Sequence, residues 1–180
     1  MKQLIKFGLI LAVICMVSTL ILTVTYEVTK PKIEEQKKLE EEAALRAIFP
    51  AAGTFAKKES GGIEYYEAIK NDSLIGYCVK AVGNGYGGYI HMIIAIDPSG
   101  AIEGLEILQH QETPGLGSKI KEIRPGDREP WFLKQFAGKT ASSIELKKNI
   151  DAITGATISS KAVTDSVRAT IDKFLAEINK

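Results

Sequence analysis

The feature that most constrains this chain is an apolar run near its amino terminus. Residues 7–26, FGLILAVICMVSTLILTVTY, contain no charged side chain. As an α-helix rising about 1.5 Å per residue, the run spans roughly 30 Å, the thickness of a bilayer's hydrocarbon core. Lys2 and Lys6 precede it as in a secretory signal, but the run is long for a signal core and has no clear small-x-small cleavage site. We expect a short basic segment at residues 1–6 and a retained transmembrane helix at residues 7–26.

The segment after this run is highly charged and also helical in character. Residues 32–48, KIEEQKKLEEEAALRAI, lead to Pro50, where a helix is expected to have ended. We expect a spacer helix at residues 27–49 and a folded domain at residues 50–180. Lysines flank both ends of the apolar run, so positive charge alone does not orient the helix in a membrane.

The domain reads as short strands followed by a helix. IEYYEAIK and LIGYCVKAV flank Asn-Asp-Ser, and YIHMIIAID and AIEGLEIL flank Pro-Ser-Gly, which predicts two hairpins. Residues 130–136 predict a short helix, and residues 160–178 carry apolar side chains at helical spacing. Tight turns between strands favour an antiparallel sheet. The predicted fold class is α+β, with the C-terminal helix packed on the sheet.

Charge and cysteine content exclude several classes of function. The net charge is +1, so nothing indicates a nucleic-acid partner. Cys15 lies in the apolar run and Cys78 in a predicted strand, so a disulfide between them is not expected. The chain has no CxxC pair and no His/Cys set at ligand spacing, and we predict no metal site.

Residues 83–88, GNGYGG, match the dinucleotide-binding pattern G-x-G-x-x-G. That pattern binds a pyrophosphate only when the glycine loop opens a helix. Here the next residues, YIHMIIAID, are strand-like. We therefore predict a glycine-rich turn and no NAD site.

Two segments carry candidate chemistry. Residues 151–160, DAITGATISS, place four hydroxyl groups and a glycine before the C-terminal helix. A helix N-terminus binds phosphate well, but Ser and Thr residues also cap helices, so the residues alone leave both interpretations open. Residues 110–119, HQETPGLGSK, form a proline-containing loop in which one His and one Glu are too few for a metal site or an acid/base pair.

Together these segments resemble the FMN-binding domain of RnfG, the G subunit of the Rnf ion-translocating electron transport complex. The related C subunit of the sodium-translocating NADH:quinone reductase, NqrC, has the same domain. The resemblance rests on Asp151, Thr154, Gly155, Ala156, Thr157 and Ser159, and on the segment ETPGLG at residues 112–117. It covers nearly the whole chain and implies one N-terminal anchor before an extracytoplasmic FMN-binding domain at residues 50–180.

The resemblance also implies a covalent cofactor. A flavin transferase with FAD as donor would esterify the phosphate of FMN to the hydroxyl of Thr157. The other cofactor-binding candidates are Thr154, Gly155, Ala156, Ser159, Ser160, Lys161, Glu112, Thr113, Leu116 and Gly117. No catalytic residue is expected, because the cofactor supplies the redox chemistry.

The function implied is electron relay within an Rnf-type ferredoxin:NAD⁺ oxidoreductase that moves ions across a bacterial or archaeal cytoplasmic membrane. The implied partners are the other membrane subunits and, during maturation, the flavin transferase. Two alternatives stay open. One is a stand-alone flavinylated carrier or the NqrC component of a quinone reductase. The other is an anchored binding or sensor domain without flavin, in which Thr-Gly-Ala-Thr is only a capped turn.

Overall fold

The computed structural model describes residues 1–178 and divides into two compact units. The first, Met1–Glu41, contains most of α1 (Lys2–Ile48), a helix that continues without a break through Pro31 and whose last residues are in the second unit. Within the described residues, α1 is the one helix long and apolar enough to cross a bilayer. Proline removes one backbone hydrogen bond from a helix interior, and the structure shows that this loss does not end α1.

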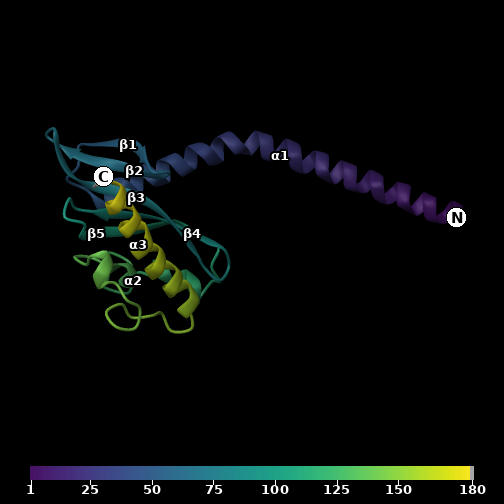
Figure 1. Cartoon of the computed structure of the whole chain (residues 1–180). Helices are drawn as coiled ribbons and strands as arrows, with labels where there is room; N and C mark the ends of the chain where they lie inside the picture. Colours follow the sequence, from purple (N-terminus) through teal and green to yellow (C-terminus); the bar gives the residue numbers. More distant parts are fainter. Residues whose placement is uncertain (179–180) are drawn as a thin grey trace. The chain divides into compact units, whose positions relative to one another are not determined.

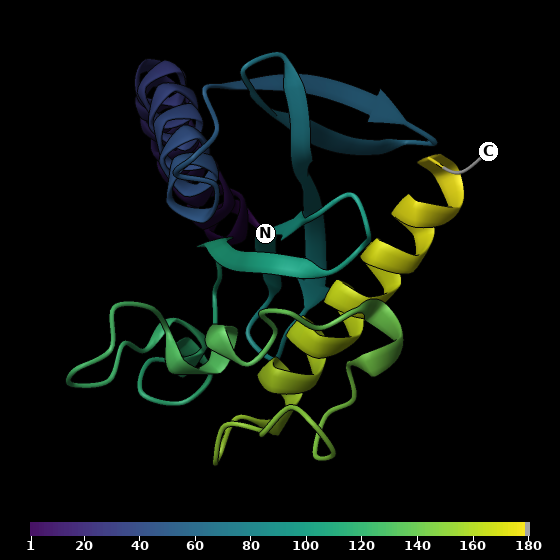
Figure 2. The same cartoon turned by 90° about the vertical axis from the view of Figure 1, so that its left-hand side faces the viewer.

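The second unit begins at Glu42 and contains a five-stranded antiparallel sheet. Its strands follow one another in space as in sequence, so the sheet is a simple meander (Figures 1 and 2). The strands are β1 (Thr54–Ser60), β2 (Ile63–Lys70), β3 (Ser73–Asn84), β4 (Tyr89–Ile96) and β5 (Ile102–Gln109). The β2–β3 and β4–β5 hairpins confirm both sequence predictions, whereas β1 was not predicted.

Asn71 and Asp72 form the tight turn of the β2–β3 hairpin. Both residues have positive φ, 49° and 59°, a conformation that Asn and Asp tolerate better than most residues. This pair of angles suits the two-residue connection of a twisted hairpin. The local chemistry of the turn therefore favours the hairpin itself, while the register of β2 against β3 shifts once beyond it, between Ala68 and Ile69.

Helix α3 (Thr157–Ile178) crosses one face of the sheet and packs on β3 (Figure 1). It begins at Thr157, three residues before the predicted start at Ser160, because the apolar periodicity that guided the prediction appears only after the first turn. Phe174 of α3 makes edge-on contacts with Tyr65 and Tyr77, at ring-centroid distances of 5.0 and 5.3 Å. These contacts fix the C-terminal half of the helix over β2 and β3.

The connection between β5 and α3 holds the short helix α2 (Trp131–Lys134) and lies beside α3 (Figure 2). Phe132 and Phe136 of this connection are fully buried in the apolar core that lies between α3 and the sheet. A second apolar cluster covers the opposite sheet face, where Leu45 and Phe49 pack near Cys78. The sheet is therefore buried on both faces, and the pocket described below lies at one end of α3.

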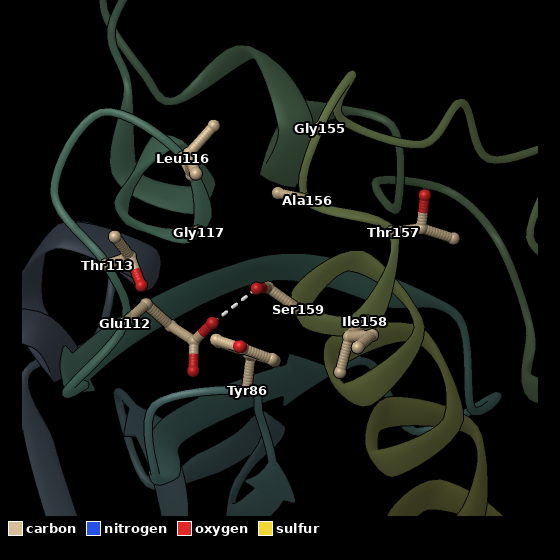
Figure 3. A pocket seen from close by; sticks show the side chains of 10 residues that line it. All are labelled: Tyr86, Glu112, Thr113, Leu116, Gly117, Gly155, Ala156, Thr157, Ile158 and Ser159. Atoms are coloured by element: carbon tan, nitrogen blue, oxygen red, sulfur yellow. Dashed lines mark hydrogen bonds between the residues drawn. The ribbon is translucent and has the colours of Figure 1, made fainter.

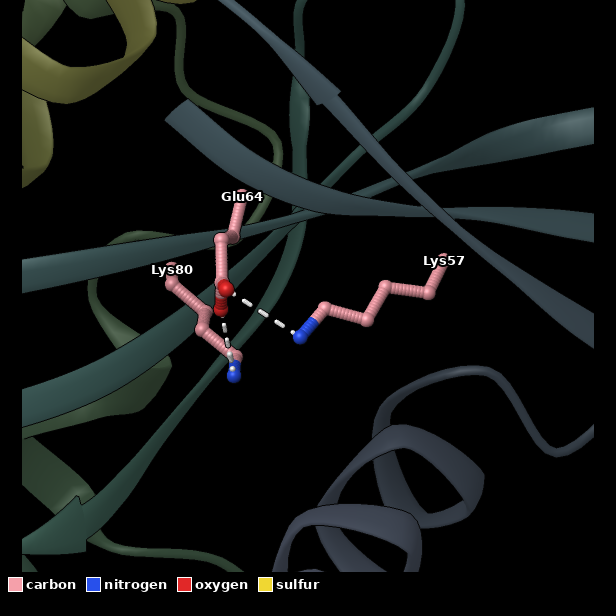
Figure 4. A network of polar contacts seen from close by, with 3 residues as sticks. All are labelled: Lys57, Glu64 and Lys80. Atoms are coloured by element: carbon pink, nitrogen blue, oxygen red, sulfur yellow. Dashed lines mark hydrogen bonds and ion pairs between the residues drawn. The ribbon is translucent and has the colours of Figure 1, made fainter. Parts of the chain in front are cut away.

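An ion network ties the first three strands together on the sheet surface. Glu64 of β2 accepts hydrogen bonds from Lys57 of β1, at 3.1 Å, and from Lys80 of β3, at 3.0 Å (Figure 4). The Lys80 bond, followed by the Lys57 bond, lowers the pKa of Glu64 below its ordinary value. Because these groups are partly exposed to water, the network specifies strand neighbours more than it stabilises the fold.

Candidate functional site

A pocket of about 420 Å³ lies where three chain segments meet at the start of α3. The segments are the β3–β4 turn, the loop after β5, and the turn that leads into α3. Figure 3 shows the ten lining residues, which are Tyr86, Glu112, Thr113, Leu116, Gly117, Gly155, Ala156, Thr157, Ile158 and Ser159. The volume is within the range of pockets that hold small molecules and cofactors.

The loop after β5 is a compact turn rather than an open strand extension. The backbone N–H groups of Leu116 and Ser118 both donate to the carbonyl of Thr113 at 3.2 Å. The Gly115 N–H donates to the Ser118 hydroxyl at 2.9 Å, and Gly115 has a φ of 74°, which favours glycine. The turn exposes Leu116 at the pocket while Gly117 is buried beneath it.

Glu112 is the one charged side chain among the ten lining residues that the structure describes, and only 5% of its surface is exposed. One carboxylate oxygen accepts the Gly87 N–H at 3.0 Å, and the other accepts the hydroxyl of Ser159 (Figure 3). Buried charged groups are costly unless hydrogen-bonded in this way. The carboxylate therefore joins the β3–β4 turn to the first turn of α3.

His110 contributes to the loop from outside the pocket. Its Nδ1 accepts the backbone N–H of Glu112 at 3.3 Å. Partial burial, followed by the charge of Lys121, lowers the pKa of His110 below its ordinary value of 6.5. A neutral imidazole keeps Nδ1 free to accept this bond, so the loop geometry and the ionisation state agree.

The turn before α3 is stabilised by a backbone hydrogen bond within the turn and by a glycine with positive φ. The Ala156 N–H donates to the Ile153 carbonyl at 3.0 Å, and Gly155 has a φ of 78°. A side chain at position 155 would also approach Leu116, since an ideal Cβ lies 3.2 Å from its Cδ2. Glycine here permits both the turn and the close approach of the two pocket-lining segments.

The hydroxyl groups near the start of α3 have different surroundings. Ser159 donates to Glu112, and Ser160 is fully buried and donates to the Ala156 carbonyl at 2.9 Å. Thr154 is exposed but does not line the pocket. Thr157 is both exposed and part of the pocket lining, at the first residue of α3.

The sequence-predicted site residues thus fall into two groups. Those that the structure brings together around the pocket are Glu112, Thr113, Leu116, Gly117, Gly155, Ala156, Thr157 and Ser159. Thr154, Ser160 and Lys161 lie outside the lining, and Lys161 is at the surface in an ion pair with Asp165, at 2.5 Å. Ile158 lines the pocket without having been a candidate, since nothing in its sequence context distinguishes it from a core residue.

The glycine-rich turn predicted at residues 83–88 is the β3–β4 connection, with residues 83–84 still paired in β3 and residues 85–88 forming the turn itself. The Gly85 N–H donates to the Gly88 carbonyl at 2.9 Å, and β4 follows directly. Because a strand and not a helix follows this loop, the arrangement lacks the geometry of a dinucleotide fingerprint. The contribution of the loop is Tyr86, whose exposed ring lines the pocket (Figure 3).

Comparison with known proteins assigns both parts of the chain. Residues 1–48 match the RnfG N-terminal region, and residues 85–172 match the FMN-binding domain. The chain is 32% identical over 169 residues to the G subunit of the proton-translocating ferredoxin:NAD⁺ oxidoreductase complex of Clostridium ljungdahlii, covering 91% of this chain and 87% of that protein. The chain belongs to the RnfG family. The resemblance seen in its two sequence segments is confirmed.

Other members of the RnfG family align over similar lengths. The G subunit of the Na⁺-translocating ferredoxin:NAD⁺ oxidoreductase complex of Acetobacterium woodii is 32% identical, over 96% of this chain and 92% of that protein. Among solved structures, the C subunit of the Na⁺-translocating NADH-quinone reductase from Parabacteroides distasonis is similar. It has a TM-score of 0.51 and 25% identity, covering 63% of this chain and 61% of that chain. This chain and that C subunit therefore share a fold over the part that is matched.

Proposed function

We propose that this chain is the flavin-carrying electron-transfer subunit of an Rnf-type ferredoxin:NAD⁺ oxidoreductase that couples electron transfer to ion translocation. The observation that carries the proposal is the convergence of both sequence segments on one pocket, inside the region that matches the FMN-binding domain. The chain would act with the other membrane subunits of the complex and would not complete a reaction alone. Its relatives are named as subunits of proton- and Na⁺-translocating complexes.

The pocket has the chemistry that FMN requires. Tyr86, Leu116 and Ile158 offer exposed apolar surface to a flat ring system, and Thr157 lies where the backbone N–H groups of a helix N-terminus favour phosphate. When bound, FMN supplies the redox chemistry, and the protein holds and orients it. The pocket residues therefore serve binding and positioning rather than acid/base catalysis.

Thr157 is the residue to which we assign a phosphoester bond with FMN. In this reaction its hydroxyl oxygen attacks the flavin-side phosphorus of FAD, the pyrophosphate bond breaks, and AMP leaves while the hydroxyl proton is released. Ser159 and Ser160 are engaged in hydrogen bonds within the protein, and Thr154 lies outside the pocket lining. Thr157 combines exposure, a place in the pocket and the helix N-terminus.

A covalent bond would suit a carrier whose pocket is lined by side chains that are exposed to solvent, such as Tyr86, Leu116 and Ile158. The ring would not need to be enclosed to stay bound, so it could remain accessible to electron donors and acceptors. The remaining phosphate charge would face the positive end of the α3 dipole. Ser160 is bonded within the turn and Lys161 is paired with Asp165, so the helix N-terminus is the group that we propose faces the phosphate.

Intact-mass measurement after co-expression with a flavin transferase tests the attachment. We expect the full-length chain to gain one FMN less one water, and Thr157→Ala to gain nothing. Ser142→Ala is the matched control, since it removes an exposed hydroxyl outside the pocket and outside the Thr-Gly-Ala-Thr motif and should be modified like the wild type. If the wild type is unmodified and binds FMN only under native conditions, the proposal that the pocket binds FMN stands and the proposal of a covalent bond is refuted. Modification that persists in Thr157→Ala would refute the site.

We also propose that residues 7–26 span the cytoplasmic membrane, that residues 27–49 act as a spacer, and that residues 50–180 lie on the extracytoplasmic side. The support is the apolar N-terminal part of α1 and its match to the RnfG N-terminal region. Alkaline phosphatase fused after residue 180 should be enzymatically active in cells. Green fluorescent protein fused at the same position should not fluoresce, because the anchor would export it. The reverse pair of results would place the domain in the cytoplasm.

Purification from the native membrane distinguishes the family alternatives. An Rnf-type subunit should co-purify with ferredoxin:NAD⁺ oxidoreductase activity. A quinone-reductase subunit should co-purify with NADH:quinone activity, and a stand-alone carrier with neither. A colourless protein without flavin in any preparation would favour an anchored sensor domain.

A further inference from the structure

Glu112 sits in a cage of glycine backbone that leaves no room for other side chains. An ideal Cβ atom built at Gly85 would fall within 3.0 Å of Oε1 of Glu112, and one built at Gly117 would fall within 3.0 Å of Oε2. At Gly87, a Cβ would collide with the Gln111 carbonyl and lie 3.2 Å from the Glu112 Cα. Glycine at these positions lets the β3–β4 turn and the loop after β5 close directly around the carboxylate.

Both oxygens of this carboxylate are engaged inside the protein. Oε1 accepts the Gly87 N–H, and Oε2 accepts the Ser159 hydroxyl, the bond drawn in Figure 3. The two bonds therefore reach segments that are far apart in the sequence. A carboxylate that is bonded to the protein through both oxygens holds the surrounding segments in place. Glu112 is nearly buried and its acceptors are directed at protein donors.

We propose that Glu112 is a positioning residue that holds the pocket in shape before FMN is attached, so that Thr157 is presented to the flavin transferase. Ser159, the partner of Glu112, lies in the same first turn of α3 as Thr157. Fixing Ser159 therefore fixes the orientation of this turn against the β3–β4 turn and the Leu116 loop. The inference rests on the proposed covalent attachment and adds the residue that prepares the site for it.

Three variants separate geometry from charge. Glu112→Gln keeps the shape and can accept from Gly87 while its amide donates to Ser159, whose hydroxyl can rotate to accept. Glu112→Ala removes both bonds, and Ser159→Ala removes one bond while leaving the Gly87 bond in place. Glu59→Gln, on the exposed surface of β1, is the matched control for loss of one negative charge.

The rate of flavin attachment to the purified full-length chain is the first measurement. A pocket that is formed only part of the time lowers the apparent affinity for the transferase, so kcat/KM should fall mainly through KM. We expect kcat/KM to fall about tenfold or more in Glu112→Ala and by a smaller factor in Ser159→Ala. Glu112→Gln should stay within about twofold of the wild type because its two hydrogen bonds are kept.

Hydrogen exchange of the flavin-free chain is the second measurement and does not depend on attachment. The Gly87 amide should exchange about tenfold faster in Glu112→Ala than in Glu112→Gln or Glu59→Gln, since it loses its acceptor. If the wild type is never flavinylated, the covalent proposal fails while this test of Glu112 still stands. Equal exchange and equal attachment in wild type and Glu112→Ala would overturn the positioning role, as would a Glu112→Gln variant as impaired as Glu112→Ala.

Discussion

The hydroxyl of Ser160 accepts the backbone N–H of Ile153 at 3.0 Å, across the Thr-Gly-Ala-Thr turn. Both residues are almost completely buried. The bond closes the turn that places Thr157 at the pocket. Ser160, which the sequence suggested as a phosphate partner, therefore stabilises the turn from its buried side.

We predict that Ser160→Ala destabilises the protein by about 1–3 kcal/mol, because a buried backbone N–H loses its acceptor. Thermal unfolding of the flavin-free chain in detergent measures this effect. Ser73→Ala, at the exposed start of β3, is the control and should leave the unfolding temperature nearly unchanged. A Ser160→Ala protein as stable as the control would mean that the turn holds its shape without this bond.

The glycines of the Leu116 loop should respond differently to alanine. A methyl group at Gly117 would lie 2.6 Å from the Ser159 hydroxyl, so Gly117→Ala should cost about 1–3 kcal/mol from overpacking and slow flavin attachment. Gly115→Ala meets no atom within 4 Å but adopts a φ of 74°, so it should cost about 1 kcal/mol from backbone strain alone. Denaturant unfolding and the rate of flavin attachment, measured for both variants, distinguish overpacking from backbone strain. Attachment slowed equally in the two variants would contradict the packing explanation.

Cys78 should be unreactive in the folded protein. Burial raises the pKa of its thiol from 9.0 to about 12, so the nucleophilic thiolate is scarce at pH 8. In a Cys15→Ala background, iodoacetamide should label Cys78 only after denaturation. Rapid labelling of the native chain at pH 8 would show that the second apolar cluster opens readily.

The same thiol links stability to alkaline pH. Because the folded pKa is raised, the folded state binds the proton more tightly, and the contribution is complete below about pH 9. It is lost as pH rises from about 9 towards about 12. Unfolding free energies of the wild type and Cys78→Ala, compared across this window, should converge as pH increases. Parallel curves would contradict the burial argument.

Asp97 should stabilise the β4–β5 turn in a manner that acid removes. Burial raises its pKa, but hydrogen bonds from Ser99, Ala101 and Gly100 outweigh burial and hold the pKa below 3.8. The contribution is therefore present above about pH 3.8 and is lost as pH falls through the folded pKa. The stability advantage of the wild type over Asp97→Asn should shrink on acidification below this value. An advantage that stays constant would mean that Asp97 is not ionised in the turn.

Sequence patterns were sufficient for the elements whose signals are local. Apolar residues at helical spacing predicted α3, and Asn71 and Asp72 predicted the β2–β3 turn. Strand β1, TFAKKES, escaped prediction because it alternates poorly and lies at the sheet edge, where its pairing to β2 depends on a partner strand. The continuity of α1 through Pro31 was also beyond a local rule, since proline usually marks a helix boundary.

For the site, the sequence identified the segments but not the role of each residue within them. Nothing local distinguishes Ser159, which donates to Glu112, from Thr157, which lies open at the pocket. These roles depend on which face of the first helical turn meets the loop after β5. Tyr86 belongs to a third segment, and only the folding of the β3–β4 hairpin brings it to the other two.

The meander sheet and the late position of α3 have a consequence for the order of maturation. Neighbouring strands are adjacent in sequence, so the sheet can form from short-range contacts while later parts of the chain are still being made. The pocket cannot, because Ile158 and Thr157 join it only when the last helix docks. Cofactor loading would therefore mark only those molecules in which α3 has docked on the sheet.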